Sequence, residues 1–114
     1  MDRVYLQYCM EACARCAEQC EHCVENCRHD AYADQLAVCM KLAQDCGEFC
    51  RMAVAMMRRE SHFAGEVCRV CAEICDVCAA QASQHEHAAC QQLASECHAC
   101  ADACRHVSMA VICA

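Results

Sequence analysis

The chain has 114 residues, 18 of them cysteine and none of them proline or tryptophan, and its formal net charge at pH 7 is −7. This length predicts one compact domain over residues 1–114. The acidic balance argues against nucleic acid as a partner, because phosphate binding needs a basic face. No stretch approaches 18 apolar residues, and the N-terminus lacks the apolar core of a secretory signal. We therefore expect no membrane-spanning segment, and a reducing cytosolic location in which cysteines remain thiols.

The usual core residues are scarce. Leu, Ile, Val and Phe together number 17, about 15% of the chain, which is too few for an ordinary interior. A neutral thiol packs as a small hydrophobe, so cysteine must supply the missing core. The lack of proline and the presence of only two glycines favour long, uninterrupted helices.

The first predicted helix covers about residues 2–29 and carries a regular column of thiols. Its six cysteines are separated by alternating gaps of four and three residues, which places them on one face of a helix. They are Cys9, Cys13, Cys16, Cys20, Cys23 and Cys27.

Three further helices are expected to carry matching stripes. The second covers about 31–58 with Asp30 as its N-cap, and the third extends to about residue 83 with Ser61 as the candidate cap. The fourth runs from about Glu86 to the end of the chain, and Leu93 fills one position of its stripe. The stripe cysteines are Cys39, Cys46 and Cys50; Cys68, Cys71, Cys75 and Cys78; and Cys90, Cys97, Cys100 and Cys104.

Four helices of this length with short connections predict an all-α fold, an antiparallel up-down-up-down four-helix bundle with a cysteine-lined core. The four stripes would then face one axis, so that 17 cysteines share a single interior. Cys113 is the exception. It follows Cys104 by nine residues, which is half a helical turn away from the stripe, so it points outside the core unless the helix deforms.

Several interpretations of the thiols fit poorly. Disulfide-dense small proteins are rich in loops and do not repeat cysteine at helical spacing. Seventeen matched thiols used only as packing would be an oxidation hazard with no advantage over alanine or valine. Five C-x-x-C pairs occur in mid-helix, whereas a thiol–disulfide enzyme normally has one such pair at a helix N-terminus.

Metal binding remains, and the charge balance favours Cu(I). A zinc ion with four thiolates leaves −2 at every site, so several such sites in one narrow core would repel each other strongly. Soft Cu(I) accepts two or three thiolates, and bridging gives about one metal per sulfur with a nearly neutral interior. Iron–sulfur clusters need a compact group of four cysteines, usually from loops, and the cysteines of this sequence are not spaced in that way. A di-iron centre is also not expected, because the chain has no Glu-x-x-His motif.

The alternating C-x-x-x-C and C-x-x-C steps of residues 9–27, with stripes on three more helices, resemble the cytosolic bacterial copper storage proteins. The resemblance covers essentially the whole chain. It implies a four-helix bundle that holds many Cu(I) ions on the 17 stripe cysteines, assembled as a homotetramer. Cys113 has no clear counterpart in this pattern.

One end of the bundle is a candidate entrance for copper. Antiparallel packing brings together the start of the first and third helices and the end of the second and fourth. Thioether and imidazole groups gather there, and members of the resembled family use Met or His near the mouth. Met57 lies on the stripe and is the best candidate, whereas His106 and Met109 point away from it; packing at the bundle end is the competing interpretation. The residues are Met52, Met56, Met57, His62, His106 and Met109.

We therefore predict a cytosolic store for Cu(I) with no enzyme activity, which exchanges copper with a chaperone or an exporter. Two alternatives stay open at this point. One is a metallothionein-like protein that sequesters zinc or soft metals in general, and the other is a thiol redox buffer.

Overall fold

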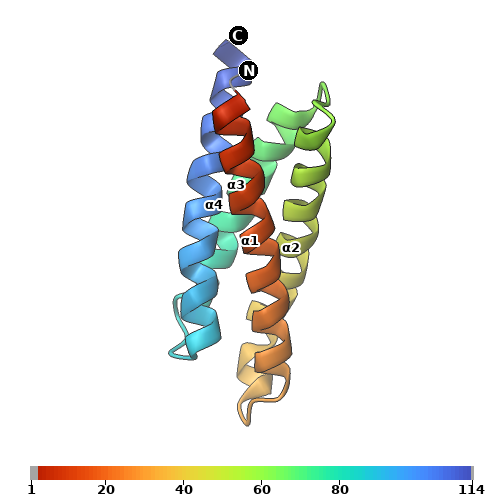
Figure 1. Cartoon of the computed structure of the whole chain (residues 1–114). Helices are drawn as coiled ribbons and strands as arrows, with labels where there is room; N and C mark the ends of the chain where they lie inside the picture. Colours follow the sequence, from red (N-terminus) through yellow and green to blue (C-terminus); the bar gives the residue numbers. More distant parts are fainter. Residues whose placement is uncertain (1–2, 114) are drawn as a thin grey trace.

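Four α-helices make up most of the described chain and pack antiparallel around one axis. The computed structural model describes the backbone of residues 3–113 and the side chains of residues 3–110. The helices are α1 (Arg3–Arg28), α2 (Ala37–Arg58), α3 (Ala64–Ala82) and α4 (Ala88–Cys113), with a short 3-10 helix, η1 (Ala33–Leu36), before α2. Each α-helix packs on the next, and α4 closes the bundle against α1 (Figure 1). The predicted fold is confirmed.

The two ends of the bundle hold different segments. The two chain ends and the α2–α3 connection lie together at one end, here called the terminal end, as Figure 1 shows. The α1–α2 and α3–α4 connections lie at the opposite, far end. The bundle is narrow for its length, with extents of 49 × 20 × 18 Å. Only one layer of helix therefore separates the axis of the bundle from solvent along its length.

The second helix begins later than the sequence analysis predicts, and Asp30 is not its N-cap. The Asp30 Oδ1 atom accepts the backbone N–H of Tyr32 at 2.8 Å, which builds a local turn. The chain then forms η1 before α2 begins at Ala37, and Leu36 stands at the N-cap without a side-chain hydrogen bond. Short polar side chains often favour such local turns over a helix start, and this alternative is invisible to helical periodicity.

Ser61 also differs from its predicted role. Phe63 occupies the N-cap of α3, and the Ser61 hydroxyl instead accepts the Phe63 backbone N–H at 3.1 Å. The preceding helix ends in a Schellman arrangement: the N–H of Ser61 bonds to the carbonyl of Met56, and that of Glu60 to the carbonyl of Met57. Glu60 takes the left-handed position of this motif, with φ of 51°.

The fourth helix begins at Ala88, two residues later than predicted, because His87 acts as its cap. The His87 Nδ1 atom accepts the Ala89 backbone N–H at 3.1 Å. On the other side of the ring, Nε2 lies 3.4 Å from Asp30 Oδ2. This contact ties the α3–α4 connection to the α1–α2 connection and closes the far end.

Cysteine and alanine make up most of the interior. Alanines such as Ala12, Ala43, Ala72 and Ala101 flank the thiol stripes and are at most 2% exposed. Such small side chains let neighbouring helices approach closely, so the axis is narrow enough for sulfur atoms on facing helices to touch. Among the described residues, no helix is both long and apolar enough to cross a lipid bilayer.

Leu93 is the large aliphatic residue in the middle of the core, and it is fully buried. We expect Leu93→Ala to lower the free energy of unfolding of the reduced apo protein by about 2–5 kcal/mol, because it leaves a cavity that cysteine and alanine neighbours cannot fill. Anaerobic urea denaturation measures this change. The matched control is Val77→Ala on the exposed face of α3, expected to change stability by no more than about 0.5 kcal/mol. Equal effects of the two substitutions would contradict the assignment of Leu93 to the core.

Candidate metal centre

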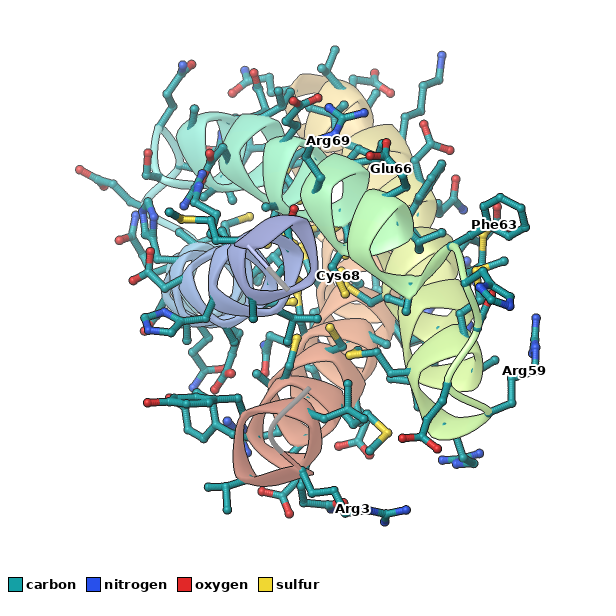
Figure 2. The ribbon with its side chains drawn as sticks, turned by 90° about the horizontal axis from the view of Figure 1, so that it is seen from above. Arg3, Arg59, Phe63, Glu66, Cys68 and Arg69 are labelled. Carbon is teal, nitrogen blue, oxygen red and sulfur yellow. The ribbon has the colours of Figure 1, made fainter. Side chains whose placement is uncertain are left out.

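All 17 stripe cysteines predicted from the sequence face the bundle axis. Each is a free thiol, and each side chain is at most 1% exposed. Viewed from the terminal end, sulfur atoms gather between the four ribbons, with Cys68 pointing inward from α3, whereas Arg3 and Arg59 lie on the outside (Figure 2). The 3.6-residue period explains this placement, since gaps of three and four keep every stripe on the inner face. Cys113 lies outside the described side chains.

The thiols touch one another across the axis. The Sγ atoms of Cys13 and Cys100 are 3.4 Å apart, and those of Cys46 and Cys75 are 3.7 Å apart. Diagonal contacts also occur, such as Cys50 to Cys100 at 3.9 Å. These separations are far longer than a disulfide bond of about 2.05 Å, so the sulfur atoms are packed and hydrogen-bonded as thiols.

Groups of four thiols lie close enough to share a metal ion, and the groups overlap. In each group all Sγ atoms lie within 4.8 Å of one another. The middle group draws two members from the group above it and two from the group below, so no boundary separates one site from the next. Three such groups are Cys13, Cys71, Cys100 and Cys104; Cys50, Cys71, Cys75 and Cys100; and Cys16, Cys46, Cys50 and Cys75.

Within the described part of the chain, the sulfur contacts fall into two sets. The long set, which contains the 13 stripe cysteines left after the four of the short set, occupies the terminal end and the middle of the bundle. The short set lies at the far end and consists of Cys23, Cys27, Cys39 and Cys90. Between them, α2 and α4 place Ala43 and Leu93 in the stripe where a cysteine would continue the column. The sequence shows that these two stripe positions lack a cysteine, but only the packing shows that they separate the long set from the short set.

Burial and mutual hydrogen bonding set the protonation of the short set. Burial, followed by the charge of Cys39 and the hydrogen bond to Cys27, raises the pKa of Cys90 to about 12. Cys39 has the opposite shift: hydrogen bonds donated by Cys23 and Cys90 lower its pKa to about 7. The short set therefore combines a thiol that holds its proton, Cys90, with one that releases its proton more readily, Cys39.

The long set behaves in the same manner. The pKa of Cys97 lies above its ordinary value because Cys16 holds its thiol proton, and the pKa of Cys50 is raised through its bond to Cys100. Burial acts in the same direction at both positions. The hydrogen bonds from Cys16 to Cys46 and from Cys100 to Cys71 act the other way and lower the pKa of Cys46 and Cys71. A metal ion must displace the protons held at the raised positions to bind there.

The observed sulfur separations are close to those of metal-bound thiolates. With a metal–sulfur bond of about 2.3 Å, two thiolates are about 3.8 Å apart in a tetrahedral site, about 4.0 Å in a trigonal site and about 4.6 Å in a linear site. Contacts of 3.4–3.9 Å across the bundle reach these values with small side-chain rotations, so the type of ligand, rather than the distance, favours one metal over another. Thiolates in such sites are the ligands that soft Cu(I) prefers.

The predicted entrance residues do not all converge. Met57 is fully buried at the terminal end of the α2 stripe, as predicted. His106 and Met109 are exposed, in agreement with their expected direction, and the His106 ring stacks on Tyr5 with centroids 5.4 Å apart. Met52 is 42% exposed on the outside of α2. Met56 is half-buried and His62 is exposed.

Met10 is a thioether that the sequence analysis did not include among the entrance residues. It is half-buried and packs against the core, and together with Met57, Leu6 and Val54 it lines a groove of about 400 Å³ between α1 and α2 at the terminal end. Its spacing of four residues from Leu6 was the available signal, because that spacing places both side chains on one edge of the α1 stripe.

The pKa shifts predict how the apo protein responds to alkaline pH. Between pH 9, the ordinary thiol value, and pH 12 the folded protein keeps the Cys90 proton that the unfolded chain has lost. Stability must therefore fall as pH rises through this window. The lowered pKa of Cys39 acts in the separate window between pH 7 and 9, where it makes stability rise with pH.

Anaerobic urea denaturation of the apo protein from pH 9 to pH 11 measures this loss, and we expect the free energy of unfolding to fall throughout. Cys90→Ala is the matched variant, and its stability should fall less steeply over the same range. A stability that stays constant above pH 9 would contradict the raised thiol pKa values.

Comparison with known proteins places the chain in a family. Residues 2–109 match the family model described as copper storage protein. The uncharacterized cysteine-rich protein YhjQ of Bacillus subtilis (strain 168) is 36% identical over 104 residues, which are 91% of this chain and 96% of that protein.

The fold is also similar to solved structures, among them the following two. One is the Cu(I)-bound copper storage protein BsCsp3, with TM-score 0.88, 36% identity and coverage of 91% of this chain and 98% of that chain. The other is a cytosolic copper storage protein from Streptomyces lividans with five coppers, with TM-score 0.91, 27% identity and coverage of 95% of both chains. Because the matched family model spans nearly all of its length, this chain belongs to the copper storage protein family.

Proposed function

We propose that this protein stores Cu(I) on the thiolates of its bundle core, with the 17 stripe cysteines as ligands. Copper is the cargo, and the bundle keeps it away from oxidants and from other binding sites. Storage needs no group that performs chemistry on a substrate, so we expect no enzyme activity. The Cu(I)-bound and copper-loaded states of the two related structures support this function.

The overlap between thiol groups is the observation that carries the proposal. A separate mononuclear zinc site has four thiolates to itself, whereas here Cys71 and Cys100 belong to two groups of four at once, as do Cys50 and Cys75. Three zinc ions could occupy the three groups only by sharing ligands. Cu(I) ions bound by bridging thiolates use the same overlap, because each sulfur then serves two ions.

The overlap also sets the expected capacity. If each thiolate bridges two ions and each ion takes two thiolates, the core holds about one Cu(I) per cysteine and stays close to neutral. Zinc in four-thiolate sites would leave −2 at every site within a bundle 18–20 Å across. Sequestration of zinc is therefore the weaker candidate.

The cellular setting of the protein is also a proposal. The Streptomyces lividans relative is described as cytosolic, and we place this chain in the cytosol, where its thiols stay reduced. The homotetramer implied by the family resemblance and exchange with a copper chaperone or exporter are expectations of the same kind. Tyr8 on α1 is exposed, and we expect it to contact a neighbouring subunit.

Copper is expected to enter at the terminal end past Met57. Its thioether is buried at the top of the α2 stripe and shares the terminal groove with Met10. A thioether is a weaker ligand for Cu(I) than a thiolate, so it can pass the ion inward. His106 and Met109 then act at most on the outer surface.

The capacity is the first test. We expect anaerobic titration with Cu(I), in the presence of a competing chelator, to reach saturation at about one ion per core cysteine. Saturation at one metal per four cysteines would favour zinc, and tight binding of no metal together with reversible oxidation would favour a redox buffer.

A single substitution tests the ligand assignment within the same titration. Cys100→Ala removes a thiol that belongs to two groups, so we expect the capacity to fall by one or two ions. Ser95→Ala, at an exposed position of the same helix, is the control and should leave the capacity unchanged. A full capacity in Cys100→Ala would contradict the assignment of this ligand.

The entrance is tested by loading kinetics. Met57→Leu keeps the buried volume and removes the thioether, so we expect slower Cu(I) uptake with an unchanged final capacity. Met52→Leu, on the exposed side of α2, is the matched control and should load at the wild-type rate. If Met57→Leu also loads at that rate, Met57 serves only as packing.

A further inference from the structure

A second groove runs along the seam between α1 and α2, halfway along the bundle. It has a volume of about 540 Å³, and Cys20 is one of the residues that line it. From α2 it is lined by Gly47, Ala43 and Arg51, and from α1 by Glu21. This groove is distinct from the terminal groove that contains Met10 and Met57, and storage alone does not require it.

The wall between this groove and the thiol core is unusually thin at Gly47. A Cβ atom on this residue would lie 3.3 Å from the Cβ atom of Cys20. The α2 backbone therefore packs directly against Cys20, and no side chain from position 47 covers the thiol. Any larger residue there would both fill the floor of the groove and press on Cys20.

A salt bridge covers this thin point from outside. The Arg51 guanidinium lies 3.6 Å from the same Cβ position on Gly47, and its Nη1 atom is 2.7 Å from Glu21 Oε1. The two side chains are 50% and 71% exposed. An ion pair in this setting contributes no more than about 1 kcal/mol, so it opens readily.

The thiol behind this cover is connected to the long set. The Cys20 thiol interacts with the thiols of Cys16, Cys46, Cys78 and Cys97. An ion bound by Cys20 is therefore in reach of the middle of the thiol core without passing the cysteines of the terminal end.

The charge of the groove favours a cation. Four carboxylates and two arginines line it, which gives a net charge of −2. An acidic cleft concentrates positive ions and repels anions. The six charged residues are Glu21, Glu25, Asp45, Glu48, Arg28 and Arg51.

We propose that this groove is a lateral route by which Cu(I), carried by a small neutral or cationic thiol complex, reaches Cys20 in the middle of the bundle. In the transfer, a copper–sulfur bond forms at Cys20 while the bond to the donor sulfur breaks. The Cys20 proton leaves on the released donor thiol, so charge and protons balance and no oxidant is needed. The inference rests on the proposed storage function, but the accessibility of Cys20 can be tested without copper.

The test measures the modification rate of Cys20 in the anaerobic apo protein by peptide mass spectrometry. Two methanethiosulfonate reagents of similar size, one cationic and one anionic, serve as probes. We expect the cationic probe to modify Cys20 severalfold faster than the anionic one. Arg51→Ala, which removes the cover, should raise both rates severalfold, and Gly47→Leu, which fills the floor, should lower them severalfold.

Controls separate the route from general loosening of the bundle. Ala55→Leu places the same leucine side chain at an exposed position of α2 outside the groove and should leave the Cys20 rate unchanged. Arg51→Ala should leave the rate at Cys68, which is buried on α3 and contacts Cys9 and Cys104 rather than Cys20, unchanged. The route is contradicted if Arg51→Ala accelerates both cysteines equally, or if neither Gly47→Leu nor Arg51→Ala alters the Cys20 rate.

Copper uptake completes the test. We expect Gly47→Leu to slow Cu(I) loading severalfold without reducing the capacity, and an unchanged loading rate would overturn the route even where labelling follows the expected pattern. A wild-type protein that binds no Cu(I) would instead overturn the proposed function, so the two failures are distinguishable.

Discussion

The packing of thiol against thiol across the axis is the contact on which this structure depends. Cysteine replaces the leucine of an ordinary bundle seam, so the residues that hold the helices together are also the proposed ligands. A buried thiol can serve both purposes only while it is neutral, because a lone buried thiolate is unfavourable. The raised pKa of Cys90 and the shared protons of the long set meet this condition. The apo fold is stable with protons on these thiols, whereas metal binding must remove the same protons.

The division of the thiols adds a second constraint. Leu93 and Ala43 restore an ordinary apolar layer between the long and short sets. This layer stabilises the apo bundle, because the Leu93 side chain buries more apolar surface than a cysteine side chain does. It also means that the far-end cysteines cannot share bridging ligands with the rest through α2 or α4. The His87–Asp30 contact lies beyond them and closes the far end of the bundle.

The helices and the inward direction of the thiols were predictable because one physical rule, the 3.6-residue period, governs both. Cys9 to Cys27 fix the inner face of α1, and the other three stripes must then meet it. Helix starts were less predictable, since Asp30 and Ser61 use their side chains in local turns that compete with capping. The grooves could not be predicted from the sequence at all. They depend on which helix edges meet, as with Gly47 against Cys20 and Met10 beside Met57.

A store must hide its ligands and still admit the ion, and these demands conflict in a narrow tube. Thiols at most 1% exposed are protected from oxidants, yet an ion that enters at the terminal end alone must pass through sites that earlier ions already occupy. Access partway along the bundle removes this difficulty, because the middle can then fill without passage through the end. The α1–α2 seam suits this role, since a glycine thins the wall and an exposed ion pair covers it. Elsewhere along α2, the buried alanines Ala43 and Ala53 keep a methyl group facing inward, so only Gly47 leaves the backbone in direct contact with a core cysteine at a groove.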